Sequence, residues 1–298
     1  MRIGLAGAGP WARTVHAPAI AAHPRWSAGG VWARRPEAAA EVAAVSGGPV
    51  HEEFDDLLAA CDAVALAVPP QVQGELAPRV AAAGKHLVLE KPLAADLASA
   101  QRVADAITTA GVCSATVLTL RFDPAIAAWL DAVPPGPHGP DTTATARWLS
   151  GALLGGPFAT SAWRAEHGAL LDVGPHVIDL LDAALGPVVG VDQARRDEPD
   201  LWRIGLAHAG GARSSLALSL RIPVDPTEFE VAIVGVAGRH RIDVRPADAV
   251  ACYGRLLDDL AAAVDAGDLH SPVDASRALH LQRVVEQVRT AALPTPKL

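Results

Sequence analysis

The chain has 298 residues, half of them hydrophobic, and 25 basic against 33 acidic residues give a formal net charge of −8 at pH 7. This length supports a sizeable core and predicts two domains. The acidic balance argues against nucleic acid and anionic membranes as partners, because both need a basic surface, and it favours a small molecule. No apolar stretch reaches the roughly 18 to 20 residues of a membrane helix, and glycine and proline interrupt the N-terminal apolar run. We therefore expect a cytoplasmic protein.

The first 120 residues alternate strand-like apolar runs with alanine-rich segments of helical spacing. The expected strands are 2–6, 27–32, 63–67, 86–90 and 113–118. The expected helices are 12–22, 36–44, 72–83 and 96–110. This alternation is typical of βαβ units and predicts a doubly wound parallel sheet in residues 1–120.

The pattern changes after the proline- and glycine-rich segment 134–140, which we expect to be a loop. A helix near 170–185 comes first, and strand-like runs follow without helices between them, at 188–194, 202–207, 214–222, 229–234 and 240–244. Helices near 250–266 and 274–292 end the chain. Residues 121–298 are therefore predicted to form an α+β domain on a mostly antiparallel sheet, whose last helix can pack back on the first domain.

A glycine-rich turn, GAGPWA, follows the first expected strand and opens a helix, as a dinucleotide-binding fingerprint requires. Gly7 permits the tight turn, Gly9 lets the backbone approach a pyrophosphate, and Ala12 allows the helix to pack closely on the strand. Pro10 and Trp11, within the same turn, are further candidate cofactor contacts. An ordinary glycine-rich turn is the alternative.

The end of the second expected strand suggests which dinucleotide is bound. NAD-binding domains usually offer a carboxylate to the ribose there, whereas this chain has Ala33 followed by Arg34 and Arg35. Two arginines suit the 2′-phosphate of NADP(H), so we expect NADP(H) to be preferred, with NAD(H) as the alternative cofactor. In the other interpretation, the arginines are solvated loop residues.

Lysine is rare in this chain, which has only Lys85, Lys91 and Lys297. A lysine amine is a compact donor whose pKa shifts readily, unlike the guanidinium of arginine. Lys91 follows an expected parallel strand, at the sheet edge where such folds bind ligands. The alternative, a surface lysine at a strand end, suits Lys297 and Lys85 better.

Asp172 and His176 lie four residues apart in GALLDVGPHVIDLL, where Pro175 suits a first helical turn, so the pair can share one helix face. A histidine beside a carboxylate and a helix N-terminus can titrate near neutral pH and transfer a proton. A structural histidine is the alternative. Cys61, Cys113 and Cys252 have no spacing typical of a metal site or disulfide framework, so we expect buried, reduced thiols and no metal.

Taken together, these motifs resemble the glucose–fructose oxidoreductase / inositol dehydrogenase / MocA family. The resemblance extends over most of the chain and rests on GAGPWA, GKHLVLEKPLA, RFDPA and ALLDVGPHVIDLLDAALG, in the family's order. It implies a Rossmann domain followed by an α+β domain whose open, mostly antiparallel sheet often forms a subunit interface. We therefore expect a homodimer or homotetramer with an open apolar sheet face.

The resemblance also implies residue roles. Glu90 and Lys91 would lie beside the nicotinamide, Asp172 would help to place the substrate, and His176 would be the acid/base. Pro69 and Gln71 would contact the cofactor after strand 63–67, although the chain reads PPQVQGE where the family commonly has Asn and then His. Further candidates for the substrate pocket, with the hydrophobic core as the alternative for the tryptophans, are Trp148, Trp163, Arg164 and His167.

The expected reaction is hydride transfer between the nicotinamide and a carbinol or carbonyl carbon of a sugar, polyol or related small molecule. One alternative is a redox-neutral, NAD-using glycosidase of the same fold. The other is a non-catalytic sensor of a dinucleotide or sugar.

Overall fold

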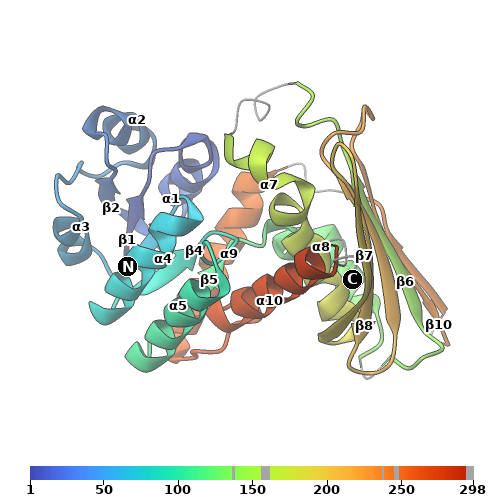
Figure 1. Ribbon diagram of the computed structural model, residues 1–298. Coiled ribbons are helices and arrows are strands. Elements are labelled where there is room, and N and C mark those ends of the chain that lie inside the picture. The colour runs from blue at the N-terminus through green and yellow to red at the C-terminus, as the bar shows by residue number, and fades with distance from the viewer. Residues whose placement is uncertain (136–137, 156–161, 237, 245–247, 293–298) are drawn as a thin grey trace. The chain divides into compact units, whose positions relative to one another are not determined.

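The computed structural model describes residues 1–135, 138–155, 162–236, 238–244 and 248–292 (Figure 1). The chain divides into two compact units. The first contains Met1–Phe122 and Pro246–His280, and the second contains Asp123–Arg245 and Leu281–Leu298. Sequence reasoning placed 121–298 in the second domain and let its last helix pack back on the first, whereas the first unit also includes the described residues 248–280. Part of the expected loop 134–140, residues 136–137, lies outside the described residues.

The first unit is built on a five-stranded parallel sheet of order β2-β1-β3-β4-β5. Its strands are β1 (Arg2–Ala6), β2 (Ser27–Trp32), β3 (Ala63–Leu66), β4 (His86–Leu89) and β5 (Ser114–Thr116). Its helical segments are η1 (Ala12–His16), α1 (Ala17–Ala22), α2 (Pro36–Ser46), α3 (Phe54–Ala60), α4 (Pro70–Ala82), α5 (Leu97–Ala110), η2 (Thr119–Phe122) and α9 (Ala249–Ala266). This confirms the doubly wound α/β fold, with α3 as an element that the sequence analysis missed.

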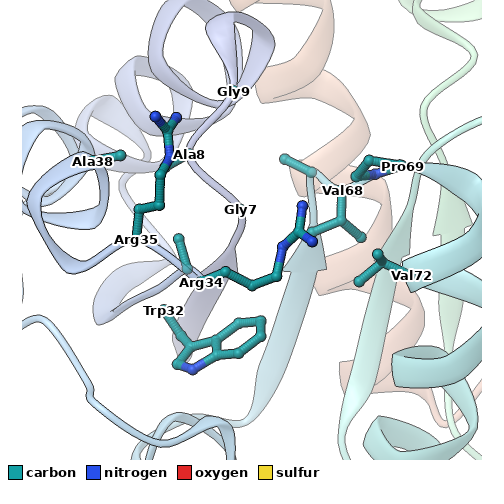
Figure 2. A pocket seen from close by; sticks show the side chains of 12 residues that line it. Gly7, Ala8, Gly9, Trp32, Arg34, Arg35, Ala38, Val68, Pro69 and Val72 are labelled. Carbon is teal, nitrogen blue, oxygen red and sulfur yellow. The ribbon is translucent and has the colours of Figure 1, made fainter. Parts of the chain in front are cut away.

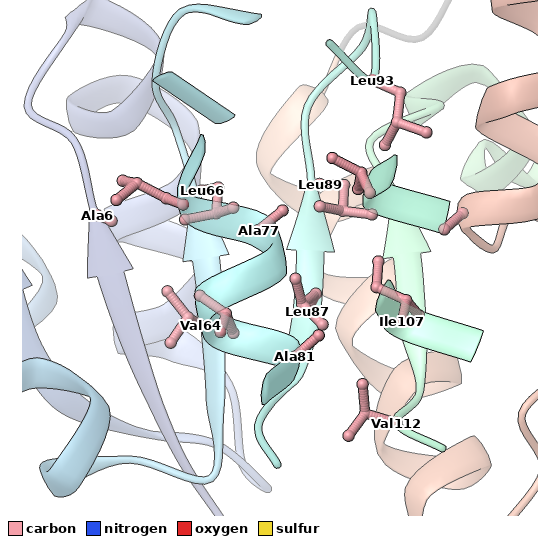
Figure 3. Close-up of a cluster of buried hydrophobic side chains, with 14 of the residues drawn as sticks. Ala6, Val64, Leu66, Ala77, Ala81, Leu87, Leu89, Leu93, Ile107 and Val112 are labelled. Atoms are coloured by element: carbon pink, nitrogen blue, oxygen red, sulfur yellow. The ribbon is translucent and has the colours of Figure 1, made fainter. Parts of the chain in front are cut away.

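Alternating side chains of the central strands build the core of this unit, which Figure 3 shows between the sheet and two helices. Val64 and Leu66 of β3 and Leu87 and Leu89 of β4 are fully buried there. The small Ala77 of α4 lies over them, because alanine lets a helix approach a sheet closely. Asp96 accepts a hydrogen bond from the backbone of Ser99 and caps α5.

The second unit contains a six-stranded sheet of order β11-β10-β6-β9-β8-β7. Its strands are β6 (Thr143–Leu149), β7 (Val188–Asp197), β8 (Leu201–His208), β9 (Arg213–Ser219), β10 (Glu228–Gly235) and β11 (Gly238–Ile242). Its helices include α6 (Pro124–Ala132), α7 (Ala162–Asp172) and α8 (Gly174–Leu185). The last helix, α10 (Ala275–Ala291), crosses the boundary between the units in sequence.

Strand β6 and helix α6 are absent from the sequence-based expectation. Strand β6 is parallel to β9, so the sheet is mixed although its other pairs are antiparallel. The alternation in TATARWL is weak because its buried positions begin with two alanines, Ala144 and Ala146, and reach a large apolar side chain only at Trp148. Tertiary pairing with β9 and β10 makes this segment a central strand.

Strand β6 does not show the open apolar face that the sequence analysis expected. The exposed side chains of β6 are Thr143, Thr145 and Arg147, and Arg147 forms ion pairs with Glu228 and Glu230 of β10. The apolar side chains of β6, Ala144, Ala146 and Trp148, point to the buried face, because successive side chains of a strand point to opposite faces of the sheet.

A second difference concerns the helix expected near 170–185. Helices α7 and α8 are separate, and Gly168 interrupts α7 with φ 63° and ψ −162°. An ideal Cβ at Gly168 would lie 2.3 Å from Oδ1 of Asp200. Asp200 is buried, and burial raises the pKa of its carboxyl group. The carboxyl group accepts hydrogen bonds from the Ala169 backbone at 2.9 Å and from the Trp202 indole at 3.3 Å. It therefore cannot move away from an added Cβ without breaking these bonds.

We expect Gly168→Ala to lower the free energy of unfolding by about 3 kcal/mol, because both the backbone conformation and the space exclude a Cβ. Gly267 is a matched control: its φ is 64°, yet no atom lies within 4 Å of an added Cβ. Gly267→Ala should cost only about 1 kcal/mol. Urea denaturation of both variants measures the difference, and equal losses would contradict the role assigned to Asp200.

No helix in the described part of the chain is long and apolar enough to cross a membrane. Cys61, Cys113 and Cys252 are buried thiols outside any disulfide, as the sequence analysis expected.

Candidate active site

The glycine turn after β1 has the geometry that the fingerprint requires. Gly7 has φ 119°, and an ideal Cβ there would lie 2.1 Å from the carbonyl oxygen of Ala67, so only glycine fits. Gly9 has open space on its Cβ side, with no atom within 4 Å. Ala12 is fully buried at the start of the helical segment, and Pro10 and Trp11 form the first turn in front of it. The turn therefore leaves backbone accessible just where a helix begins.

A cavity of about 520 Å³ opens over this turn, at the carboxyl ends of β1, β2 and β3 (Figure 2). Its lining residues are Gly7, Ala8, Gly9, Trp32, Ala33, Arg34, Arg35, Ala38, Ala67, Val68, Pro69 and Val72. These include the predicted Pro69, whereas in the described lining Val72 takes the place expected for Gln71, which is exposed. The cavity lies at the edge where open α/β sheets bind ligands.

Arg34 and Arg35 belong to the lining, and both are exposed. Figure 2 shows Arg34 reaching across the cavity towards Val68, while Arg35 extends beside Ala38 and Ala8. Ala33, where NAD-binding domains usually carry a carboxylate, adds no charge. This part of the cavity is therefore cationic and suits an anionic group.

Glu90 and Lys91 directly follow β4, two strands from β1 at the same sheet edge. Gln73 of α4 holds the main chain here. Its side chain accepts a hydrogen bond from the Glu90 backbone N–H at 2.8 Å and donates to the carbonyl oxygens of Glu90 and Leu93 at 2.7 and 2.9 Å. Gln73 is fully buried, so the carboxamide replaces the water that these backbone groups would otherwise bind.

The Glu90 side chain has a partner that sequence reasoning missed. Its Oε1 lies 2.8 Å from Nε2 of His16, and Nδ1 of His16 lies 2.8 Å from the hydroxyl group of Tyr253 on α9. His16 and Tyr253 are fully buried, whereas the Glu90 side chain is 16% exposed. The only local signal for His16 was its position in the helix after the glycine turn.

In the second unit, Asp172 is the last residue of α7 and His176 lies in the first turn of α8. The expectation that they share one helix is therefore wrong, because Gly174 and Pro175 begin a new helix. Asp172 pairs with Arg164, whose Nε lies 2.8 Å from Oδ2. This joins two predicted substrate-side residues.

The remaining predicted residues of this unit differ in burial. Trp148 is 8% exposed and packs edge-on against Phe229, and its ring centroid lies 6.3 Å from that of His176. Trp163 stacks on His167 with centroids 5.0 Å apart, and both are half-buried. Trp148 is therefore a core residue that borders His176.

Residues 1–118 match the model of an oxidoreductase family with an NAD-binding Rossmann fold, the GFO_IDH_MocA family. A dTDP-3,4-didehydro-2,6-dideoxy-α-D-glucose 3-reductase from Streptomyces violaceoruber is 32% identical over 192 residues, which cover 62% of this chain and 55% of the reductase. A levoglucosan dehydrogenase from Pseudarthrobacter phenanthrenivorans is 28% identical over 210 residues, covering 64% and 53%. The chain thus matches about half the length of these curated relatives.

The fold recurs over the whole chain. The WlbA dehydrogenase from Bordetella pertussis, solved with NADH and UDP-GlcNAcA, superposes with a TM-score of 0.80 at 24% identity and covers 99% of both chains. Other solved structures of this fold hold NAD or NADP. The motifs of the first unit, its Rossmann sheet and the family match together place residues 1–118 in the glucose–fructose oxidoreductase / inositol dehydrogenase / MocA family.

Proposed function

We propose that this protein is an NAD(P)-dependent dehydrogenase or reductase that acts on a carbinol or carbonyl carbon of a sugar, polyol or related small molecule. The observation that carries the proposal lies in the first unit. The Gly7 turn and its cavity occupy the same edge of the parallel sheet as Glu90 and Lys91. A dinucleotide bound at this edge extends from the adenosine half over β2 to the nicotinamide half over β3 and β4.

The residues present fit such a cofactor. Gly9 leaves the backbone open to a pyrophosphate, the start of the helical segment η1 adds N–H donors, and Arg34 and Arg35 supply positive charge on the β2 side. The bound cofactor supplies hydride exchange at its nicotinamide.

The protein's own residues supply the charge and proton handling. Lys91 stabilises negative charge developing on the reacting oxygen, and His176 delivers or removes the proton. Asp172, held by Arg164, places the substrate. The bonds from Gln73 to the main chain on both sides of Lys91 and from Arg164 to Asp172 support the assignment, because a preorganised group needs little reorganisation during the reaction.

The redox-neutral glycosidase and the sensor remain distinguishable by experiment. The purified protein is incubated with a panel of sugars, inositols, keto-sugars and sugar nucleotides, and NAD(P)H absorbance is followed while mass spectrometry identifies any copurified cofactor. Net NAD(P)H change supports the dehydrogenase. Substrate cleavage without net change supports the glycosidase, and binding without turnover supports the sensor.

We expect NADP(H) to be preferred, and Arg34→Ala to lower kcat/KM for NADP(H) about 10- to 100-fold while changing the value for NAD(H) little. The reason is that a hydrogen bond to a charged phosphate contributes about 1.5–3 kcal/mol. Arg79→Ala is the control, since Arg79 is an exposed arginine of α4 that pairs with Asp55. A preference for NAD(H) that Arg34→Ala leaves unchanged would contradict the proposed role of Arg34 in binding NADP(H).

Lys91→Met should lower kcat at least ~100-fold without a comparable loss of cofactor affinity, because it removes a charge that acts in the transition state. His176→Ala should also flatten the pH profile of kcat, since it removes the titrating group. Lys85→Met, at the opposite end of β4, serves as the control. Near-normal turnover in both catalytic variants would make the sensor the leading interpretation.

We also propose a homodimer or homotetramer. Support comes from the exposed face of the mixed sheet, where Thr145 and Ser215 are small and the Arg147–Glu230 ion pair balances charge. An exposed sheet face of small and charge-balanced side chains can pack against the same face of a second copy. Light scattering at micromolar concentration should give two or four times the 30.7 kDa chain mass, and a monomer would refute the proposal.

A further inference from the structure

A buried chain of hydrogen bonds runs from α9 to the candidate nicotinamide site. It consists of Tyr253, His16 and Glu90, linked by two contacts of 2.8 Å. Tyr253 is the sole tyrosine of the protein, and His16 is the last residue of the π-helical turn η1. The three residues come from separate elements of the first unit, yet only Glu90 retains exposed surface. The chain therefore opens at the carboxylate.

The direction of the hydrogen bonds follows from burial. Desolvation raises the pKa of Tyr253 well above its ordinary value, so the phenol keeps its proton. Among the described residues Nδ1 of His16 is the hydrogen-bond partner of this buried hydroxyl group, so the hydroxyl donates to Nδ1, since accepting from it would leave the phenol proton unpaired. His16 consequently carries its proton on Nε2 and donates it to Oε1 of Glu90. Tyr253 selects the histidine tautomer that favours an ionised Glu90.

The backbone of Glu90 is held independently. Gln73 bonds both its N–H and its carbonyl oxygen, so the main chain and the side chain are each anchored by a buried group. The main chain and the carboxylate of Glu90 are therefore fixed by separate buried groups, which defines where the carboxylate lies.

Topology places this carboxylate towards the nicotinamide half of a dinucleotide. The sheet order β2-β1-β3-β4-β5 changes direction between β1 and β3. The adenosine half belongs on the β2 side, with Arg34, and the nicotinamide half on the β3 and β4 side, where Glu90 follows β4. The oxidised nicotinamide ring is positively charged and the reduced ring is neutral, so a nearby anion distinguishes them.

We infer that Tyr253 and His16 are positioning residues that hold Glu90 as a fixed carboxylate, which makes the site favour the oxidised over the reduced form of the bound cofactor. The inference rests on the proposed function and assigns a role to two residues remote in sequence from the chemistry. Because it concerns cofactor binding, it is tested without knowledge of the substrate.

The experiment measures dissociation constants of the oxidised and reduced cofactor by isothermal titration calorimetry. It uses whichever of NADP and NAD the wild-type protein binds more tightly. The variants are Glu90→Gln, Tyr253→Phe, His16→Leu and His16→Gln. His16→Gln is the conservative variant, because its amide N–H can donate to Glu90 without a tautomer choice. His23→Leu is the control, since His23 is a buried histidine that also contacts α9, but its ion-pair partner is Asp258 and not Glu90.

Glu90→Gln and His16→Leu should each shift the ratio of the two dissociation constants about tenfold towards the reduced form, the factor that corresponds to 1.4 kcal/mol. Tyr253→Phe should shift it in the same direction by a smaller factor, and His16→Gln should restore most of the preference. His23→Leu should lower thermal stability and leave the ratio within about twofold of wild type.

A ratio unchanged in Glu90→Gln would overturn the inference. So would a shift in Glu90→Gln alone, because the carboxylate would then act without His16 and Tyr253. If the wild-type protein binds neither form of either dinucleotide, the proposed function fails as well, which separates the two cases.

Discussion

The contact between the Gly7 turn and the carbonyl group of Ala67 is the constraint on which the cofactor pocket depends. A Cβ at residue 7 would lie 2.1 Å from that oxygen. Only glycine therefore lets the chain that leaves β1 pass so close to Ala67, the residue after β3. This close passage lets the helical segment begin at the carboxyl edge of the sheet, with Ala12 buried beneath it. The shape of the cavity and the backbone N–H donors at the helix start therefore depend on the absence of a side chain at Gly7.

Buried polar side chains then make the edge of the sheet rigid. A polar group removed from water costs free energy unless it finds a partner. Gln73 satisfies the backbone around Glu90, and His16 and Tyr253 satisfy each other and the carboxylate. The result is that the loop carrying Glu90 and Lys91 has few alternative conformations, although it lies at a ligand-binding edge where loops are ordinarily more mobile.

The second unit uses a related device. Asp200 is buried below the kink at Gly168 and accepts the free backbone N–H of Ala169, so α7 changes direction at a defined residue. Arg164 and Asp172 lie on opposite sides of this kink and form an ion pair across it. In both units a buried polar side chain, Gln73 in the first and Asp200 in the second, fixes the backbone by hydrogen bonds. The backbone then determines where the nearby partly exposed side chains lie.

The sequence by itself determined the features that depend on local spacing. The strand and helix periods predicted the parallel sheet. The glycine turn and the segment Ala33, Arg34 and Arg35 predicted part of the pocket lining, because the residues of each segment are neighbours in the chain. Tertiary structure decided what depends on distant partners. The strand identity of 143–149 comes from pairing with β9 and β10, and Tyr253 meets His16 across 237 positions of sequence. Composition and periodicity carry no record of which buried polar groups meet, since each such pairing is settled by the packing of whole elements.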